Sequence, residues 1–263
     1  MKKRLDVLTS EKGIFGSREK AKAGIMAGLV LVDGQVCDKP GMSVCETAEI
    51  SLKEVSCPYV SRGGLKLEKA LKTWGFSLEG TKAVDIGAST GGFTDCMLRN
   101  GAGRVYCIDV GYGQLDWKLR TDERVVNMEK CNIRYLDVDE IGRDVDFASI
   151  DVSFISLKLV LPVAALLLHD EACLVCLVKP QFEAGREQVG KNGIVRDPKV
   201  HIRVIENVIG YGEESGLYPW GLTYSPITGT KGNIEYLLFM KKKKCDNEID
   251  VEELVSEAHT TLK

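Results

Sequence analysis

The stretch TKAVDIGASTGGFTD, residues 81–95, decides which fold is expected for this chain. The largely apolar run 83–86 predicts a short strand, the glycines at 87, 91 and 92 predict a tight turn, and a helix follows from Phe93. Glycine has no Cβ, so it permits positive φ and lets a ligand lie against the main chain. A strand, a glycine turn and a helix in this order bring backbone N–H groups up to a ligand.

The glycines are spaced G-x-x-x-G-G, because Ser89 stands where a dinucleotide-binding G-x-G-x-x-G turn has its second glycine. Asp85 adds an acceptor at the mouth of the turn. Together these residues favour S-adenosylmethionine over NAD as the ligand, with a plain strand-to-helix turn as the alternative. The next predicted strand, 104–109, ends in Asp109 at the same sheet edge, where a carboxylate binds ribose hydroxyls in either class of enzyme. Asn132, in a later loop, is the candidate to face an adenine.

The composition is that of a globular protein, with 44% hydrophobic and 28% charged residues over 263 positions. This length accommodates one α/β domain and a small appendage. The net charge of −3 gives no overall nucleic-acid signature, so any basic surface must be local. The longest apolar stretch, 159–168, is too short to span a bilayer and contains Pro162, so it predicts a buried helix and no membrane association.

The nine cysteines are scattered along the chain. Cys173 and Cys176 have C-x-x-C spacing, but they lie in an apolar strand pattern with no second pair and no nearby histidine. They are therefore interpreted as buried thiols, and no metal is expected. Reduced thiols and the lack of a signal peptide predict a cytoplasmic protein.

The N-terminal segment is locally basic: residues 1–22 carry seven Lys and Arg against three acids. Ser17 is expected to cap a second helix whose Ala21, Ile25 and Met26 face inward. A hairpin with an Asp33-Gly34 turn and a third strand follow. From charge alone, a solvated helix face and an RNA-binding surface explain this segment equally well.

Four motifs in this segment, RLDVL (4–8), SREKA (17–21), VLVDG (30–34) and KPG (39–41), resemble the small RNA-binding domain shared with ribosomal protein S-four. In that family paired helices and the following hairpin present basic side chains to RNA. The resemblance implies RNA contacts at Arg4, Ser17, Arg18, Lys22, Lys39 and, after the linker, Arg62. Contacts of this kind to phosphates position an RNA without specifying its sequence.

Polar residues stand at the ends of later predicted strands, at Asp151 and Lys179, and Glu235 interrupts an apolar final strand. Lys66 lies on the helix before the glycine turn. Each of them alone is explained as a salt-bridge or surface residue. Strand order would nevertheless bring the four to one cleft, at the sheet edge where open α/β folds bind ligands. The glycine- and charge-rich segment 183–198 predicts a mobile loop that serves as a lid.

The motifs YVSRGGLKL (59–67), VDIGASTGGFTD (84–95), IDVSFISL (150–157), LVKPQFEAG (177–185) and KGNIEYL (231–237) resemble the TlyA family. These hemolysin-named proteins join an S-four-type domain to an FtsJ-like (RrmJ-like) ribose methyltransferase. The resemblance implies an α/β fold, a Rossmann-like class I methyltransferase whose seven-stranded sheet has an antiparallel final pair, preceded by a small α+β RNA-binding domain. The implied division is 1–56 for RNA binding, 57–60 as linker, 61–243 for methyl transfer and 244–263 as a charged tail, which is expected to be weakly helical and frayed.

Matched motif by motif, the Lys-Asp-Lys-Glu tetrad of FtsJ-like enzymes falls on Lys66, Asp151, Lys179 and Glu235. Lys179 can take the proton of a ribose 2′-hydroxyl only when it is neutral, and the two acids would orient the lysines and balance the sulfonium charge. The resemblance implies cofactor contacts at Asp85, Gly87, Ala88, Ser89, Thr90, Gly91, Gly92, Phe93, Asp109, Val110, Asn132 and Asp151. It implies S-adenosylmethionine as cofactor and ribosomal RNA or a ribosomal subunit as partner, with cytidine as the methylated nucleotide.

Three other functions are weighed against methyl transfer. The family name includes contact haemolysis, but no secretion signal, spanning segment or amphipathic membrane helix in the sequence supports a pore-former. A nicotinamide oxidoreductase would retain NAD and not S-adenosylmethionine in a binding assay. An RNA-binding module without catalysis is disfavoured by the intact tetrad.

Overall fold

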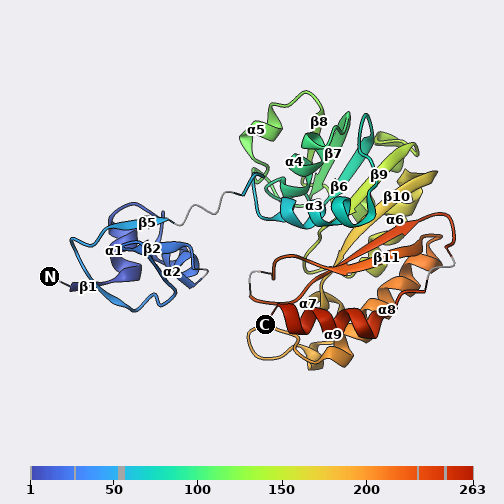
Figure 1. Ribbon diagram of the computed structural model, residues 1–263. Coiled ribbons are helices and arrows are strands. Elements are labelled where there is room, and N and C mark those ends of the chain that lie inside the picture. Colours follow the sequence, from blue (N-terminus) through green and yellow to red (C-terminus); the bar gives the residue numbers. More distant parts are fainter. Residues whose placement is uncertain (1, 27, 53–56, 230, 246–247, 263) are drawn as a thin grey trace. The chain divides into compact units, whose positions relative to one another are not determined.

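The computed structural model describes residues 1–263 apart from 1, 27, 53–56, 230, 246–247 and 263. The chain divides into two compact units, Met1–Pro58 and Tyr59–Lys263 (Figure 1). The expected linker, 57–60, spans this division, and the four residues before it lie outside the described residues. Each unit has a hydrophobic core of its own.

The first unit is built from two short helices and two small sheets. Its elements are β1 (Lys2–Arg4), α1 (Leu5–Glu11), α2 (Arg18–Met26), β2 (Val30–Val32), β3 (Gln35–Cys37), β4 (Ser43–Cys45) and β5 (Ile50–Leu52). Strands β3, β2 and β5 form an antiparallel sheet in that order, and β1 pairs with β4. Both helices pack on these strands, where Leu5, Leu8, Ile25 and Val30 are buried.

The local predictions for the first unit agree with the structure except at one position. The backbone N–H of Lys20 donates to Ser17 Oγ at 3.2 Å, which is the expected cap of α2. Asp33 and Gly34 have φ of 50° and 80°, as a two-residue hairpin turn requires. Met26, expected to face inward, is instead 65% exposed. The buried stripe of α2 is Ala21, Gly24 and Ile25, and a residue one position further lies about 100° around the helix, outside that stripe.

The second unit is an α/β sandwich around a seven-stranded sheet. Its strands are β6 (Lys82–Ile86), β7 (Arg104–Asp109), β8 (Val125–Glu129), β9 (Val145–Ile150), β10 (Leu168–Val178), β11 (Tyr218–Tyr224) and β12 (Tyr236–Lys241). They lie in the order β11-β12-β10-β9-β6-β7-β8, and β12 runs antiparallel to both of its neighbours. The pairs from β10 through to β8 are parallel. The predicted fold class, with its antiparallel final pair, is confirmed.

Helices cover both faces of this sheet (Figure 1). They are α3 (Gly63–Trp74), α4 (Gly92–Arg99), α5 (Trp117–Arg120), α6 (Leu161–Leu167), α7 (Pro180–Glu183), α8 (Pro198–Glu214) and α9 (Val251–Thr261), with short 3₁₀ turns at Ile133–Tyr135, Val138–Glu140, Leu157–Leu159 and Arg186–Gln188. Successive residues of a strand face opposite layers: Ala83 packs in the core with α3 and α4, whereas Val84 packs in the core with α6 and α8. The sheet is therefore covered by an apolar layer on each face.

The C-terminal segment differs from its prediction as a frayed tail. Residues 251–261 form α9, which packs on α8 and β11, with Val255 and Ala258 fully buried. Burial of this apolar stripe stabilises a helix in a segment that the sequence predicts to be only weakly helical. The apolar helix expected at 159–168 is also shorter, because α6 ends at Leu167 and β10 begins at once. None of the helices in the described part of the chain is long and apolar enough to cross a membrane.

Candidate active site

The parallel strands of the second unit end side by side at one sheet edge. In the ladder Ile86 of β6 lies opposite Ile108 of β7 and Ile150 of β9, and Ile150 lies opposite Cys176 of β10. The residues that follow these strands, Gly87, Asp151 and Lys179 among them, therefore lie along a single edge. This is the edge at which the sequence predicts a ligand.

The glycine turn is held in a conformation that depends on its residue types. Gly87 and Gly91 have φ of 87° and 93°, and Ser89 between them has φ of 49°. A Cβ on Gly87 would lie 2.5 Å from the carbonyl oxygen of Asp151, and one on Gly91 would overlap Leu119. Gly91 thus lies against α5 behind the turn, while the other predicted cofactor residues of the turn line a cavity.

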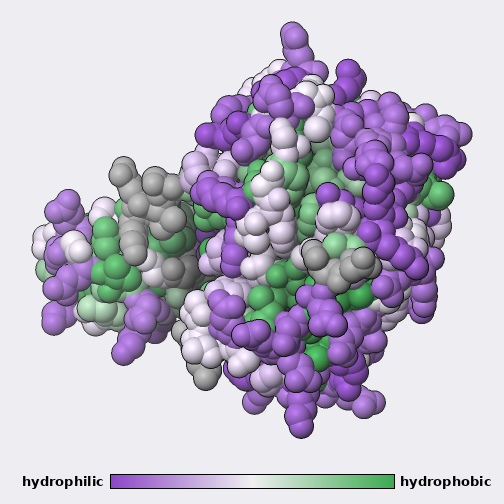
Figure 2. Space-filling model, turned by 45° about the vertical axis from the view of Figure 1, so that its right-hand side comes forward, coloured by the Kyte–Doolittle hydropathy of each residue, from purple (hydrophilic) through white to green (hydrophobic). Residues whose placement is uncertain are grey.

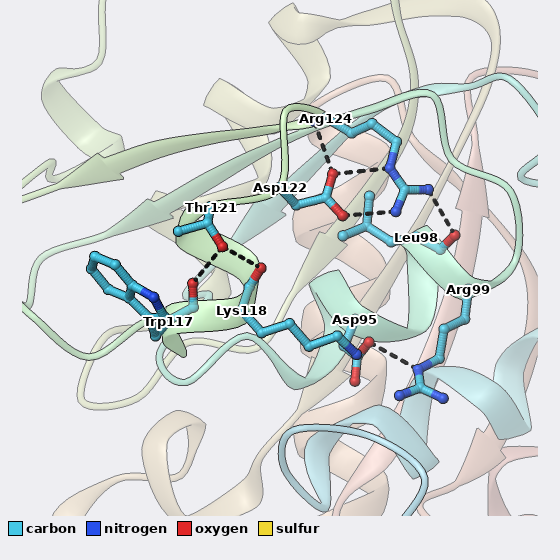
Figure 3. Close-up of polar contacts among 8 residues, drawn as sticks. All are labelled: Asp95, Leu98, Arg99, Trp117, Lys118, Thr121, Asp122 and Arg124. Carbon is cyan, nitrogen blue, oxygen red and sulfur yellow. Dashed lines mark hydrogen bonds and ion pairs between the residues drawn. The ribbon is translucent and has the colours of Figure 1, made fainter.

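Helices α3 and α4 begin against each other, beside this cavity. A Cβ on Gly92 would overlap Ser61 Oγ and would lie 2.9 Å from the backbone nitrogen of Gly64. The buried Asp95 of α4 ties the two segments, because its Oδ2 accepts from the N–H of Val60 at 2.9 Å. Its Oδ1 accepts from Arg99 Nε of the same helix at 2.9 Å (Figure 3). The first turn of α3, which carries Lys66, is therefore fixed to the glycine turn.

The far end of α4 is tied to the loop after α5. Arg124 donates to the carboxylate of Asp122 at 2.8 and 3.0 Å and to the carbonyl oxygen of Leu98 at 3.3 Å (Figure 3). These bonds hold α5, whose Leu119 supports Gly91, against the helix that follows the turn. Trp117 on α5 is 75% exposed and takes no part in this support.

Asp85 lies beneath the glycine turn and is 1% exposed. Its Oδ1 accepts from Ser149 Oγ at 2.9 Å, and its Oδ2 accepts from Thr94 Oγ1 at 2.7 Å and from Thr94 N at 3.0 Å. Burial raises the pKa of this carboxyl to about 6, and the three hydrogen bonds oppose the rise only in part. Its partners are protein groups, so Asp85 holds α4 to the sheet while it also borders the cavity.

Two cavities meet at the glycine turn and share Gly87, Ser89, Asp151 and Ser153. The first, of about 440 Å³, is lined by Ile86, Ile108, Asp109, Val110, Asn132, Ile133 and Val152 besides the shared residues. The second, of about 320 Å³, is lined by Ser61, Arg62, Lys66, Asp85, Ala88, Thr90, Gly92, Phe93 and Lys179 besides the same shared residues. The predicted cofactor residues, apart from Gly91, are thus brought together along one groove.

The first cavity has the chemistry of a nucleoside site. Asp109 accepts from the N–H of Ser89 at 2.8 Å and from the N–H of Gly111 at 2.7 Å, which fixes its carboxylate at the cavity wall. Each carboxylate oxygen keeps a second lone pair for ribose hydroxyls. The isoleucines at 86, 108 and 133 offer apolar surface to a base. Asn132 lines the same cavity, but its Oδ1 caps the turn Ile133–Tyr135 by accepting from Arg134 N at 3.2 Å, so its carbonyl has a structural partner.

The four residues of the predicted tetrad converge where the second cavity ends. Lys179 Nζ lies 2.5 Å from Asp151 Oδ1, and Lys66 Nζ lies 3.7 Å from Asp151 Oδ2 and 2.8 Å from Glu235 Oε2. Both lysines are 8% exposed and Glu235 is 3% exposed. The arrangement is a chain of alternating charges, Lys179–Asp151–Lys66–Glu235. Lys66 lies on α3, Asp151 and Lys179 directly follow β9 and β10, and Glu235 directly precedes β12. Each buried charge therefore has an opposite charge beside it.

A third cavity, of about 770 Å³, opens on the other side of the tetrad. It shares Lys66, Ser153, Lys179 and Gly229 with the second cavity and is further lined by Phe154, Gln181, Phe182, Ala184, Arg186, Val189, Gly190, Gly193, Lys231, Asn233 and Glu235. Four of these residues are cationic and one is an acid, so the cavity suits a phosphodiester chain. On the larger unit, Figure 2 shows hydrophobic residues exposed in a hollow that hydrophilic residues surround.

Three residues at the tetrad were missed by sequence reasoning. Ser153 Oγ accepts from Lys179 Nζ at 3.1 Å. Phe154 has φ of 64°, is 90% exposed and lies 4.8 Å from the ring of Phe182, centroid to centroid. Gln181 donates to Glu235. All three residues fall within motifs quoted above. Their contacts with the tetrad became apparent only from the structure, because nothing in the motifs distinguishes them from their neighbours in sequence.

The segment 183–198, expected from its composition to be a mobile lid, is held by hydrogen bonds in its second half. The N–H of Val195 donates to Asn233 Oδ1 at 3.0 Å, and Asn233 Nδ2 donates to the carbonyl of Gly193 at 2.8 Å. The buried ring of His201 lies 3.0 Å, at Nε2, from the carbonyl oxygen of Val195. These contacts hold residues 193–195, and the two bonds to Asn233 join residues too far apart in sequence to be anticipated.

The predicted RNA contacts of the first unit cluster around an acid. Asp6 is fully buried, and its carboxylate accepts from Arg4 Nε at 3.0 Å and from Arg18 Nε at 3.0 Å. Hydrogen bonds from Arg4 and Arg18 hold the pKa of Asp6 down at about 2. The N–H of Asp6 also donates to the carbonyl of Pro40, next to Lys39. Arg4, Arg18 and the turn that carries Lys39 thus meet, with Lys22 one turn further along α2. Arg62 belongs to the second unit and lines its second cavity.

Among the described residues, no group of three or more His, Cys, Asp or Glu side chains is arranged to hold a metal ion. In the C-x-x-C pair Cys176 is buried and Cys173 is half-buried within β10. Burial raises the pKa of both thiols, Cys173 to about 11, so they behave as packing residues.

Comparison with known proteins matches two family models. Residues 59–242 match the FtsJ-like methyltransferase model, and residues 3–50 match the S4 domain model. The chain is 52% identical to YqxC of Bacillus subtilis, named as an rRNA methyltransferase, over 100% of this chain and 96% of that one. It is 41% identical to the 16S/23S rRNA (cytidine-2′-O)-methyltransferase TlyA of Mycobacterium tuberculosis, over 90% of this chain and 89% of that one.

A solved structure from Streptococcus thermophilus, described as a hemolysin, superposes with a TM-score of 0.80 at 50% identity, covering 98% of this chain and 96% of that one. A methyltransferase structure from Listeria monocytogenes superposes with a TM-score of 0.51 at 15% identity, over 70% of this chain and all of that one. The second likeness concerns the fold alone.

Proposed function

The chain belongs to the TlyA family of FtsJ-like RNA methyltransferases with an N-terminal S4 domain, and from this premise we propose that it methylates a ribose 2′-oxygen of ribosomal RNA with S-adenosylmethionine. We further propose cytidine as the target nucleotide, as in the name of the mycobacterial relative. The substrate would be met in the cytoplasm, where ribosomes are assembled. The observation that carries the proposal is the tetrad at the junction of a nucleoside-type groove and a basic cavity.

The groove fits the cofactor that the family implies. Asp109 would hold its ribose hydroxyls, the apolar wall formed with Ile108 and Ile133 would hold its base, and the turn at 87–92 would border its amino-acid end. Bound S-adenosylmethionine supplies an electrophilic methyl group on a positively charged sulfur. Asp151, which borders both cavities of the groove, would lie nearest to this charge and stabilise it.

The tetrad would hold and deprotonate the ribose 2′-hydroxyl. Lys179 borders both the groove and the basic cavity, and in its neutral form its Nζ can accept the hydroxyl proton as the oxygen gains its new bond to carbon. Asp151, 2.5 Å from that nitrogen, would stabilise the ammonium that results. Lys66 and Glu235 would fix the opposite side of the site, and much of the rate would come from holding the reacting atoms in line.

Charges outside the tetrad support an RNA substrate. Arg186 and Lys231 line the basic cavity, where they would neutralise phosphates on either side of the target ribose. In the first unit Arg4, Arg18, Lys22 and Lys39 would dock more distant phosphates of the same RNA. These contacts position the RNA and leave the choice of nucleotide to the second unit.

The proposal is tested with the full chain, labelled S-adenosylmethionine, and purified ribosomal RNA or ribosomal subunits. Nuclease digestion and mass spectrometry should find 2′-O-methylcytidine in ribosomal RNA. Methylation on a base, or none on either RNA or subunits, would overturn the proposal. Leakage of liposomes that Lys179→Ala leaves unchanged would instead support the membrane activity suggested by the name of a relative from Brachyspira hyodysenteriae, Hemolysin A.

A further inference from the structure

A fifth polar side chain completes the tetrad. Gln181 lies two residues after Lys179, in the first turn of α7, and its Nε2 donates to Glu235 Oε1 at 3.0 Å. The other oxygen of Glu235 accepts from Lys66 Nζ at 2.8 Å. Both oxygens of this buried carboxylate therefore have a defined donor, one charged and one neutral.

The chemistry of the contact fixes which way the amide of Gln181 points. A carboxylate only accepts hydrogen bonds, so the NH₂ group must face Glu235 and the carbonyl Oε1 must turn away. That oxygen is buried and accepts no hydrogen bond from the described residues. A buried acceptor without a partner is destabilising. The amide of Gln181 is thus oriented so that Nε2 bonds to Glu235, while its Oε1 is left without a hydrogen bond from the described residues.

The backbone confines Glu235 from the other side. A Cβ on Gly229 would lie 2.6 Å from Glu235 Oε1, so only a glycine leaves room for the carboxylate at this position. The turn is closed by a hydrogen bond from the N–H of Gly229 to the carbonyl of Asn233 at 2.9 Å, and the carbonyl of Glu235 accepts from Ser225 N at 2.8 Å. Gln181, Lys66 and this turn together leave the carboxylate a single position.

These contacts close a ring around the place where the tetrad meets the basic cavity. Starting from Lys179, the ring runs through Asp151, Lys66, Glu235 and Gln181, and returns to Lys179 through Pro180, whose ring restricts the backbone. Among the five side chains that the polar contacts join, Gln181 alone is uncharged. Any displacement of its amide passes through Glu235 to Lys66, which is held between the two acids.

We propose that Gln181 is a positioning residue, which fixes the Glu235 carboxylate and through it the ammonium of Lys66. The proposal rests on the function proposed above. Gln181 acts through Glu235 and lies outside the groove assigned to the cofactor. Its loss should therefore lower the rate of methyl transfer and leave binding of S-adenosylmethionine intact. A residue needed only for folding would change binding and stability together.

The test uses Gln181→Met in the full chain, a substitution of similar volume that removes both polar atoms. The matched control is Gln188→Met, in the exposed turn Arg186–Gln188, which lines none of the three cavities. We expect kcat on ribosomal RNA to fall at least about tenfold in Gln181→Met, with KM for RNA and the Kd for S-adenosylmethionine changed less than about threefold. The control should keep kcat within about twofold.

A double-mutant cycle with Glu235→Gln identifies the partner through which Gln181 acts. Rates are followed under single-turnover conditions, so that losses of several orders of magnitude remain measurable. If Gln181 acts through Glu235, adding Gln181→Met to Glu235→Gln lowers the rate less than about twofold further. Additive losses, a normal kcat in Gln181→Met, or a loss confined to S-adenosylmethionine binding would each overturn the inference. An unmodified chain that fails to methylate ribosomal RNA would overturn the proposed function instead.

Discussion

Lys66 Nζ donates a hydrogen bond to Glu235 Oε2 at 2.8 Å, although the two residues are 169 positions apart in the chain. The bond joins α3 to the residue directly before β12. Both side chains are nearly buried, and Asp151 lies 3.7 Å from the same ammonium. Removal of either partner would therefore leave a buried charge without its neighbour.

Replacement of Lys66 should separate stability from catalysis. Lys66→Met leaves the Glu235 carboxylate buried with Gln181 as its remaining donor, so we expect the free energy of unfolding to fall by about 3 kcal/mol and methyl transfer to be lost. In Lys66→Met/Glu235→Gln the buried charge is gone, so most of the stability should return while activity stays absent. Denaturant titration and single-turnover assays measure the two effects. Activity recovered together with stability would exclude a catalytic role for the pair.

Gly92 should tolerate no side chain. A Cβ there would overlap Ser61 Oγ and approach the backbone of Gly64, which forces apart the starts of α3 and α4. Gly92→Ala should lower the free energy of unfolding by about 2 kcal/mol and weaken S-adenosylmethionine binding at least about tenfold, as measured by calorimetry. The control is Gly210→Ala in α8, where a Cβ meets nothing within 4 Å, so neutral or slightly higher stability is expected. Equal behaviour of the two variants would refute the packing argument.

Asp6 should support RNA binding in spite of its negative charge. Its carboxylate orients the guanidinium groups of Arg4 and Arg18, whose hydrogen bonds hold its pKa at about 2. Asp6→Asn removes an acid from a basic surface but also frees both arginines, so we expect RNA affinity to fall about three- to tenfold. Asp38→Asn, at an exposed acid beside Lys39, should leave affinity unchanged or raise it. Filter binding at several salt concentrations compares them. Tighter binding by Asp6→Asn would mean that charge alone governs this surface.

Asp85 should make stability fall as the pH rises through mildly acidic values. Burial raises its pKa to about 6, above the 3.8 of the unfolded chain, so between these values the folded protein binds more protons than the unfolded one. Raising the pH from about 4 to about 6 should therefore remove on the order of 2–3 kcal/mol of unfolding free energy contributed by this group. The variant Asp85→Asn should lack that decline. Parallel stability curves for the two proteins across this range would show that the carboxyl is not destabilised by burial.

The sequence sufficed for those features that depend on local pattern. Glycine spacing and strand period located the turn at 87–92 and most strands, and the motifs around Asp151 and Lys179 located the sheet edge. Shared strand ends then followed from parallel topology, because carboxyl ends of parallel strands meet at one edge. The convergence of the four tetrad residues was predictable in this way, whereas their individual distances were not.

The remaining features depend on contacts between distant segments. Gln181 meets Glu235 across 54 positions, and Asn233 holds the segment at 193–195 across about 40. The helix α9 is stabilised by burial of Val255 and Ala258 on α8 and β11, which its acidic sequence does not reveal. Asp6 was counted as one acid among basic residues, although it organises two of them. Tertiary packing decided each of these cases.

In the proposed mechanism Lys179 takes the hydroxyl proton, while the groove around Asp109 holds the cofactor independently of this lysine. Lys179→Ala separates the two roles when methyl transfer to ribosomal RNA and S-adenosylmethionine binding are measured on the same preparation. We expect transfer to fall by roughly a hundredfold or more and the Kd for S-adenosylmethionine to change less than about threefold. Near-normal turnover in Lys179→Ala would contradict this account.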